Sequence, residues 1–339
     1  MYQNGQLGLA VLGGGIFATE VWSRSKSSSD KARSIAKDLR LGHNIDAYNE
    51  EDPSSTLAKL LLRSDIHAVL VILPIPSQPP VILQALEAGK HVLSEKPVAM
   101  DVESGKRLVE EYTSKYQPRG LVWRVAENWE VEPGYVWAAE QIRSGALGKI
   151  HTFGLEAVLY VHNENNKYFD TEWRKSPKHQ GGFMLDAGVH NAAALRILLP
   201  SVISEVSAYT ALNNQHLAPV DLIQAVVRCE DGSIGRFCLD YGARGREAAN
   251  ETFVSGDQGI ITIRDITNEH SGQAQEVILT TGPGDSRHKV TRRFPKTGIQ
   301  REQELFFDQV KGLYEQILRD VAFIEATLQS DGQPIKLQA

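Results

Sequence analysis

The first 124 residues alternate short apolar runs with segments of helical periodicity, and this alternation constrains the fold more than any other feature of the sequence. The run 67–73 has the length and composition of a strand buried on both faces, and a helix-like segment follows it. This order is typical of βαβ units in a parallel sheet with right-handed crossovers. We expect strands at 7–12, 67–73, 91–94 and 121–123, and helices at 28–39, 57–62, 80–88 and 101–112.

From about residue 125 the pattern changes to period-two alternation, with turn sequences such as Glu230–Ser233 between the segments, which indicates a large, mostly antiparallel sheet. The predicted fold is therefore α/β, with a Rossmann-like dinucleotide-binding domain at 1–124 and a C-terminal α+β domain for substrate and dimerisation at 125–339. The last helices are candidates to pack back on the first domain. We expect strands at 151–161, 202–212, 223–229, 235–241, 252–255 and 260–264, and helices at 136–142, 300–310 and 317–328.

Composition narrows the possible functions. With 36 basic and 42 acidic residues the net charge is −6, so the chain lacks the basic excess of nucleic-acid-binding proteins. Its two cysteines, Cys229 and Cys238, are too few for a disulfide scaffold, and we expect no metal site. Four prolines interrupt the uncharged run Ala68–Leu86, which excludes it as a membrane span. The first nine residues lack signal-peptide features, so a cytoplasmic location is predicted.

The first apolar run ends in a glycine-rich turn of the form G-x-G-x-x-A, at residues 13–18. Such a turn lets the backbone approach a pyrophosphate, and the N–H groups of a following helix favour the anion. A turn with a purely structural role remains the alternative. The predicted cofactor-binding residues in this turn are Gly13, Gly15, Ile16 and Phe17.

Ser23 and Arg24 follow near the expected end of the second strand. An arginine flanked by hydroxyl groups is suited to the 2′-phosphate of NADP, so NADP is predicted over NAD. A solvated basic turn is the alternative.

The spacing between the glycines and Arg24 is unusually short. From Gly15 to Arg24 there are nine positions, whereas the ribose-binding residue of a Rossmann unit lies about 20 residues beyond the glycines. Either the first helix and most of the second strand are absent, or the segment 28–39 serves as the first crossover. A deletion in the gene or in splicing would produce the same spacing. We therefore expect a first domain shortened at its first crossover, with a weakened cofactor site and an exposed sheet edge.

Two further motifs carry candidate catalytic groups. Lys96, in Glu95–Pro97 at the end of a predicted strand, is placed to donate to a substrate oxygen, although an ordinary surface lysine is the alternative. Asp186 and His190 lie four residues apart at the start of a predicted helix, so both can face one substrate. The alternative is an N-cap aspartate followed by a core histidine.

Together these motifs resemble the glucose–fructose oxidoreductase, inositol dehydrogenase and MocA (Gfo/Idh/MocA) family over nearly the whole chain. The most specific runs are Ala88–Pro97 and Gly181–His190. The segments Val125–Trp129 and Asn166–Arg174 are similar to the fungal NADP(H)-dependent branch. A family acid three residues after the histidine is replaced here by Ala193.

The resemblance implies a Rossmann domain, a nicotinamide cofactor, a homodimer formed through the C-terminal sheet, and sugar or polyol substrates. It also implies that Lys96, Asp186 and His190 are catalytic, with a proton shuttled by His190 or Lys96. The further cofactor contacts that it implies are Leu73, Pro74, Gln78, Glu95, Lys96, Asn128, Trp173 and Arg174.

The sequence therefore predicts an NADP(H)-dependent oxidoreductase that acts on a carbonyl or secondary alcohol. A non-catalytic binding or scaffold protein with a degraded nucleotide site is the main alternative, and the short first crossover favours it. A cofactor-independent lyase or hydrolase would fit the same lysine, aspartate and histidine but leaves the glycine turn unexplained.

Overall fold

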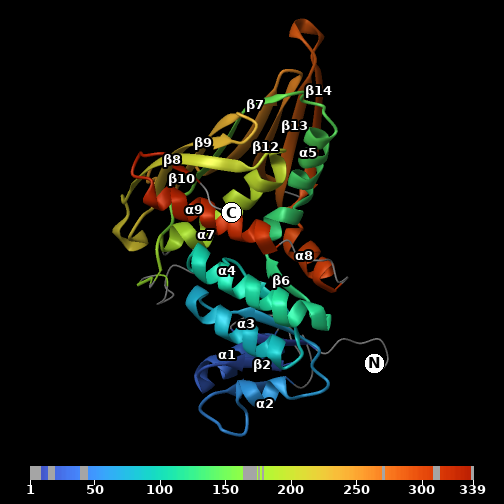
Figure 1. Cartoon of the computed structure of the whole chain (residues 1–339), viewed down its shortest axis with the longest axis vertical. Helices are drawn as coiled ribbons and strands as arrows, with labels where there is room; N and C mark the ends of the chain where they lie inside the picture. Colours follow the sequence, from blue (N-terminus) through green and yellow to red (C-terminus); the bar gives the residue numbers. More distant parts are fainter. Residues whose placement is uncertain are drawn as a thin grey trace. The chain divides into compact units, whose positions relative to one another are not determined.

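The chain forms two compact units in a computed structural model, Met1–Ala126 with Gln303–Tyr314 and Glu127–Glu302 with Glu315–Ala339. Figure 1 shows the elements of each unit. The residues whose structure is described are 9–13, 20–38, 45–162, 174, 176, 177, 179–268, 272–307 and 314–336.

The first unit is built on a six-stranded sheet of order β3-β2-β1-β4-β5-β6, in which every neighbouring pair is parallel. This confirms the predicted Rossmann-like parallel sheet. The strands are β1 (Leu9–Gly13), β2 (Glu20–Ser23), β3 (Asp46–Asn49), β4 (Ala68–Ile72), β5 (His91–Glu95) and β6 (Trp123–Ala126). The helices are α1 (Lys26–Asp38), α2 (Leu57–Leu61), α3 (Gln78–Glu87) and α4 (Val102–Glu111), with short turns η2 (Ile75–Ser77), η3 (Tyr112–Tyr116) and η4 (Gln117–Arg119).

Apolar side chains from the strands, from α1 and from one helix distant in the sequence make the core of this unit. Val11, Val21 and Leu70 are buried there, and Phe306 packs against the same cluster from a segment near the C-terminus. Helices pack against the sheet: α1 contacts β2 and β3, and α3 contacts β4 and β5. Strands covered by helices in this way are rich in apolar residues.

The first crossover has no room for a helix of ordinary length. Gly13 ends β1 and Glu20 begins β2, which leaves six residues, whereas a crossover that contains a helix needs at least about 10–12. The helix α1 follows β2 and leads to β3, so the interpretation of segment 28–39 as the first crossover is wrong. The expectation that most of the second strand is lost is also wrong, because β2 pairs with both β1 and β3. The sheet therefore keeps its strand order and lacks only the space for its first helix.

The second unit contains a nine-stranded sheet of order β14-β13-β12-β11-β7-β10-β9-β8-β15. Only β7 and β10 pair in parallel, so the sheet is mostly antiparallel, as predicted. The strands are β7 (Ile150–Val158), β8 (Ile203–Ala211), β9 (Leu222–Cys229), β10 (Ile234–Asp240), β11 (Ala249–Gly256), β12 (Gly259–Asn268), β13 (Gly272–Thr281), β14 (His288–Pro295) and β15 (Ile335–Lys336).

Helices cover the core face of this sheet. Trp137 of α5 lies near Phe294 of β14, and Phe323 of α9 meets Phe237 of β10 edge to face at 4.6 Å between ring centroids. The helix α7 lies beneath the sheet and is buried on nearly all sides. The helices of this unit are α5 (Pro133–Arg143), α7 (Phe183–Leu198) and α9 (Tyr314–Gln329), with short turns η5 (Asn128–Val131), η6 (Gln215–Leu217) and η7 (Gly284–Ser286). The helix α8 (Gly298–Phe307) is divided, because its residues from Gln303 belong to the first unit.

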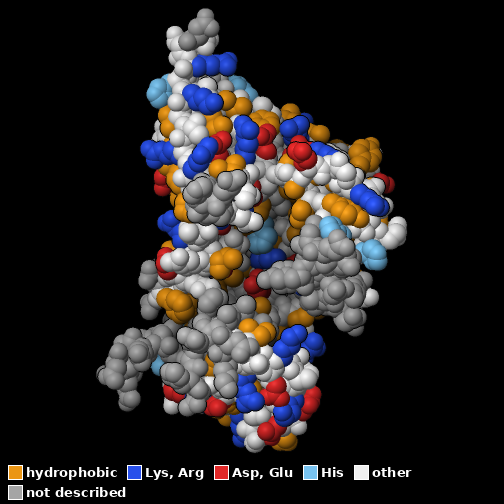
Figure 2. Space-filling view, turned by 180° about the vertical axis from the view of Figure 1, so that it is seen from behind, with side chains coloured by type: hydrophobic (Ala, Val, Ile, Leu, Met, Phe, Trp, Pro, Cys, Tyr) orange, Lys and Arg blue, Asp and Glu red, His pale blue; other side chains and the backbone are white. Residues whose placement is uncertain are grey.

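Strands β13 and β14 were not predicted from the sequence. β14 is an edge strand, and its exposed residues Lys289, Arg292 and Arg293 hide the alternation that would mark a strand. Lysine and arginine side chains gather over this part of the unit in Figure 2. Charged side chains on an edge strand disfavour pairing with other chains, which explains the polar composition.

We predict that Phe306→Ala lowers the free energy of unfolding by about 3–5 kcal/mol, because Phe306 is 3% exposed and fills the core of the first unit. Urea denaturation measures the loss. The adjacent Phe307 is 43% exposed and provides a matched control, for which Phe307→Ala should cost less than about 1 kcal/mol. Equal losses for the two variants would contradict the packing of Phe306 in this core.

Candidate functional site

In the first unit, the predicted cofactor residues lie where parallel strands end. Gly13 ends β1, Ser23 ends β2, and Glu95 ends β5. Leu73 and Pro74 directly follow β4, and Lys96 directly follows β5. Because the strands are parallel, these ends share one edge of the sheet, where open α/β sheets bind ligands. Gly15, Ile16 and Phe17 lie outside the described residues.

Arg24 lies directly after β2 and is exposed. Its carbonyl accepts a long hydrogen bond from the Glu50 N–H at 3.4 Å, which ties this turn to the end of β3. Ser23 is half-buried beside it, and α1 begins at Lys26. Arg24 thus lies at the same sheet edge as Gly13 and Glu95, and its contact with a 2′-phosphate stays a prediction.

The loops that follow β4 and β5 are joined through Gln78. This side chain is fully buried, and its amide nitrogen donates to the carbonyl oxygen of Pro97 at 3.5 Å. At the end of β5, Trp123 donates its indole N–H to the hydroxyl of Ser94 at 3.0 Å. Lys96 lies between these two anchors and is half-buried. The predicted ribose-side residue Gln78 therefore also supports the loop of the predicted catalytic lysine.

In the second unit, α7 carries the other two predicted catalytic residues. Gly181 and Gly182 precede the helix with φ of +72° and +50°, a backbone region that favours glycine. The helix begins at Phe183, so Asp186 is its fourth residue, and Gly182 is the N-cap. The alternative of Asp186 as an N-cap is therefore wrong. His190 lies four residues further, on the same face of the helix.

Asp186 is paired with a predicted cofactor residue. The Nε atom of Arg174 donates to its carboxylate at 2.8 Å, and Asp186 is 5% exposed. An arginine at this distance stabilises an ionised buried carboxylate. Trp173 lies outside the described residues, and Asn128 begins η5 in the same unit.

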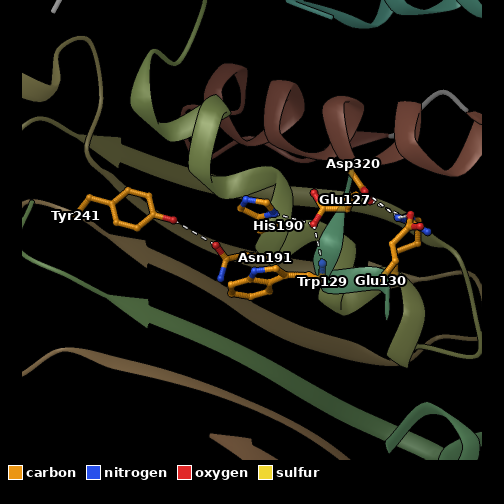
Figure 3. Close-up of polar contacts among 8 residues, drawn as sticks. Glu127, Trp129, Glu130, His190, Asn191, Tyr241 and Asp320 are labelled. Atoms are coloured by element: carbon orange, nitrogen blue, oxygen red, sulfur yellow. Dashed lines mark hydrogen bonds and ion pairs between the residues drawn. The ribbon is translucent and has the colours of Figure 1, made fainter. Parts of the chain in front are cut away.

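His190 is held by two residues that sequence reasoning did not assign to the site (Figure 3). Its Nδ1 atom lies 2.6 Å from Oε1 of Glu127, and its ring stacks on Trp129 with 5.5 Å between centroids and 16° between planes. The same Glu127 oxygen accepts the backbone N–H of Trp129 at 3.1 Å. The signal that was missed is an acidic residue directly after a strand, in the run Val125–Trp129.

A buried charge cluster lies further along α7. Arg196 donates to both carboxylate oxygens of Asp320, at 2.7 and 2.9 Å, and also to Glu130. Burial raises the pKa of Asp320 to about 7, and the nearby Glu130 and Glu127 carboxylates act in the same direction, against the lowering effect of Arg196. Asp320 therefore gains or loses its proton near neutral pH, in the same unit as His190.

A hydrogen bond between uncharged groups holds Asn191, the residue after His190. The hydroxyl of Tyr241 donates to the side-chain oxygen of Asn191 at 3.2 Å (Figure 3). Burial, with a smaller contribution from Asp186, raises the pKa of Tyr241, which therefore stays protonated. The hydroxyl thus acts as a structural donor on this side of α7.

The geometry assigns different chemistry to the two units. The first presents a lysine at a ligand-binding sheet edge, and the second presents an imidazole backed by a carboxylate beside an arginine-paired aspartate. Such groups are suited to general acid–base catalysis. Among the described residues, no group of three or more histidine, cysteine, aspartate or glutamate side chains is arranged to hold a metal ion. Within the same residues, no helix combines the length and apolar character needed to cross a bilayer.

Comparison with known proteins shows similarity in both parts of the chain. Residues 7–118 match the family model described as "Oxidoreductase family, NAD-binding Rossmann fold", and residues 139–336 match "Oxidoreductase family, C-terminal alpha/beta domain". The chain is 35% identical to the dehydrogenase FPY6 of Fusarium mangiferae, with 96% of each chain covered. It is 27% identical to the scyllo-inositol 2-dehydrogenase (NAD(+)) of Bacillus subtilis, over 71% of this chain and 65% of that protein.

Solved structures show the same fold. An oxidoreductase from Thermotoga maritima superposes with a TM-score of 0.79 at 28% identity, covering 98% of both chains. A levoglucosan dehydrogenase in complex with NADH and L-sorbose superposes equally well, with a TM-score of 0.79, at 18% identity. It covers 98% of this chain and 99% of that one.

The alignment with the Fusarium dehydrogenase also bears on the short crossover. It extends over 353 positions, whereas 96% of this 339-residue chain is only about 325 residues. About 28 aligned positions of that relative therefore have no counterpart here. A chain shortened at its first crossover is consistent with a gap of this size.

We predict that the stability of the chain depends on pH through Asp320. Its ordinary pKa is 3.8, so between about pH 4 and 7 the folded state holds a proton that the unfolded state has released. The stability from this group is therefore present below pH 4 and is lost as the pH rises through 7, by at most about 1.4 kcal/mol per pH unit.

The measurement is urea denaturation from pH 5 to 8 for the wild type and Asp320→Asn, in which this pH-dependent component should disappear. Asp46→Asn, at a carboxylate that is 72% exposed, is the control and should keep it. Identical pH profiles for the wild type and Asp320→Asn would contradict the prediction.

Proposed function

Because the chain belongs to the Gfo/Idh/MocA family of oxidoreductases, we propose that it transfers a hydride between NADP(H) and a carbonyl or secondary alcohol of a sugar, polyol or related small molecule. Family membership makes it an oxidoreductase that acts on CH–OH groups. The observation that carries the proposal is His190, an imidazole backed by a carboxylate and one helical turn from the buried Asp186. The named dehydrogenases and reductases among its relatives support the substrate class.

The residues at the sheet edge of the first unit fit part of a dinucleotide. Ser23 and Arg24 suit a 2′-phosphate, and Leu73, Pro74 and Gln78 suit the ribose side. The pyrophosphate lacks a full crossover helix to bind it, because only six residues join β1 and β2. When bound, the nicotinamide supplies the acceptor or donor of a hydride.

The chain's own residues then manage the oxygen and its proton. We assign to Lys96 a hydrogen bond to the substrate oxygen, which stabilises the charge that develops there. We assign to His190 the exchange of the hydroxyl proton, and to Asp186, held by Arg174, the orientation of a substrate hydroxyl. The methyl group of Ala193 stands where the family resemblance implies an acid, so this helix offers one acceptor fewer than that resemblance implies.

The proposal extends to assembly and location. Exposed apolar side chains on the nine-stranded sheet, including Tyr209 and Val226, support a homodimer formed through this sheet. The cytoplasmic location rests on composition.

We predict that Lys96→Ala lowers kcat by at least about 100-fold, because the substrate oxygen loses its donor. The measurement is NADP(H)-dependent turnover of a panel of aldoses, inositols and their oxidised forms, with circular dichroism to confirm folding. Lys59→Ala, at an exposed lysine of α2, is the control and should leave kcat unchanged. Undiminished activity of Lys96→Ala would remove the lysine from the mechanism.

We also predict that the short first crossover weakens NADPH binding. Titration followed by nicotinamide fluorescence should give a Kd at least about tenfold higher than that of the Fusarium relative. A chimaera in which that relative's segment between its first two strands replaces residues 14–19 should recover most of the difference. Equal affinity of this chain and the relative would contradict the prediction, whereas no binding at millimolar NADPH would favour the non-catalytic alternative.

A further inference from the structure

We propose that Glu127 is a positioning residue that fixes the orientation and the protonation pattern of the His190 imidazole, so that Nε2 is presented to the substrate. The inference deepens the proposed function and rests on it, since it assigns His190 the proton transfer.

The first support is the hydrogen-bond pattern around one oxygen atom. Oε1 of Glu127 lies 2.6 Å from Nδ1 of His190 and also accepts the Trp129 N–H at 3.1 Å. With Glu127 as the ionised carboxylate, both of its oxygens only accept, so the imidazole donates from Nδ1 just as the backbone N–H of Trp129 donates. In the neutral ring Nε2 then carries the lone pair, which is the form that can take a proton from a hydroxyl group.

The second support is the packing that limits rotation of the ring. The His190 ring stacks on Trp129, which stacks in turn on Tyr135 with 5.6 Å between centroids and 23° between planes. Tyr135 is 2% exposed, and the ammonium of Lys296 lies 5.6 Å from the centre of the Trp129 ring. Glu127 is itself 2% exposed, so both partners of His190 are held by the interior of the unit.

The third support is the distribution of charge around the pair. On α7, Asp186 is neutralised by Arg174, and Arg196 binds Glu130 of η5 and Asp320 of α9. The Lys296 ammonium lies over the ring of Trp129. Glu127 is the carboxylate in direct contact with His190, so its charge stabilises the imidazolium that forms when the ring accepts a proton.

In the oxidative half-reaction, the His190–Glu127 pair takes the proton of the substrate and the nicotinamide takes the hydride. The substrate O–H bond breaks and its proton moves to Nε2 of His190, while the C–H bond breaks and its electron pair leaves as a hydride for the nicotinamide. The carbonyl double bond forms, and the imidazolium keeps its Nδ1–H bond to Glu127. In the reductive direction the same proton returns from Nε2 to the oxygen.

Two substitutions distinguish the hydrogen-bond acceptor of Glu127 from its negative charge. Glu127→Ala removes the acceptor, so the ring should revert toward the form with its proton on Nε2, which histidine prefers in water. Glu127→Gln keeps an acceptor oxygen, since the Trp129 N–H still requires one, but removes the charge. It should therefore keep the Nδ1–H form of the neutral ring, while the imidazolium that forms during turnover loses the charge that stabilises it.

The test uses full-length protein with ¹⁵N-labelled histidine and NMR of the imidazole nitrogens, in which His190→Asn identifies the signals. This measurement needs neither cofactor nor substrate, so its outcome is separate from that of the proposed function. Glu132→Gln is the matched control. Glu132 is five residues from Glu127 and is equally buried, but its carboxylate accepts the Thr297 N–H instead of contacting His190. It should leave the His190 signals unchanged.

Activity provides the second measurement once a substrate is found. Glu127→Ala should lower kcat about 10- to 100-fold, and Glu127→Gln should lower it less. Glu127→Gln should lower kcat while the proton of the neutral ring stays on Nδ1, a combination that a merely structural role would not produce. An unchanged proton position on His190 in Glu127→Ala would overturn the proposal. If that variant does not fold, a His190 ring with its proton on Nε2 in Glu127→Gln would do so.

Discussion

The burial of α7 on nearly all its sides is the constraint on which the second unit depends. A polar side chain on such a helix loses its hydration and must find a partner within the protein. Asp186 is paired with Arg174, His190 with Glu127, and Arg196 with Asp320 and Glu130. The need to satisfy buried polar groups has therefore placed a row of fixed, charged and titratable groups along one helix, which is what acid–base chemistry requires.

The first unit depends on a different constraint, the common direction of its six strands. Parallel pairing brings the ends of β1, β2, β4 and β5 to one edge, although the residues that follow them are far apart in the sequence. The buried amide of Gln78 then joins two of the loops at that edge. The match of residues 7–118 to an NAD-binding Rossmann fold agrees with this arrangement, and the six-residue connection between β1 and β2 departs from it.

Much of the fold could be predicted because strong local patterns coincide with it. The continuous apolar run at β4 and the alternation in β9 and β10 are visible in the sequence. The four residues of β2 are too few to show a pattern, and the charges of β14 conceal one. Asp186 and His190 were predictable because four residues separate them, whereas Glu127 lies 63 residues from His190, a contact that no local pattern reports. Asp320 was missed for the same reason, since it meets Arg196 from a helix 124 residues away.

The pairing of β1 with β2 across only six residues separates two properties that usually come together. In a parallel sheet the crossover helix both returns the chain to the starting edge and covers one face of the sheet. Here six residues, too few for such a helix, join two strands that pair in the register Ala10–Glu20, Val11–Val21 and Leu12–Trp22. The strand order of the unit therefore does not require a long first crossover. We expect changes of length in this one segment to alter cofactor affinity, while the sheet and the acid–base groups of α7 stay the same.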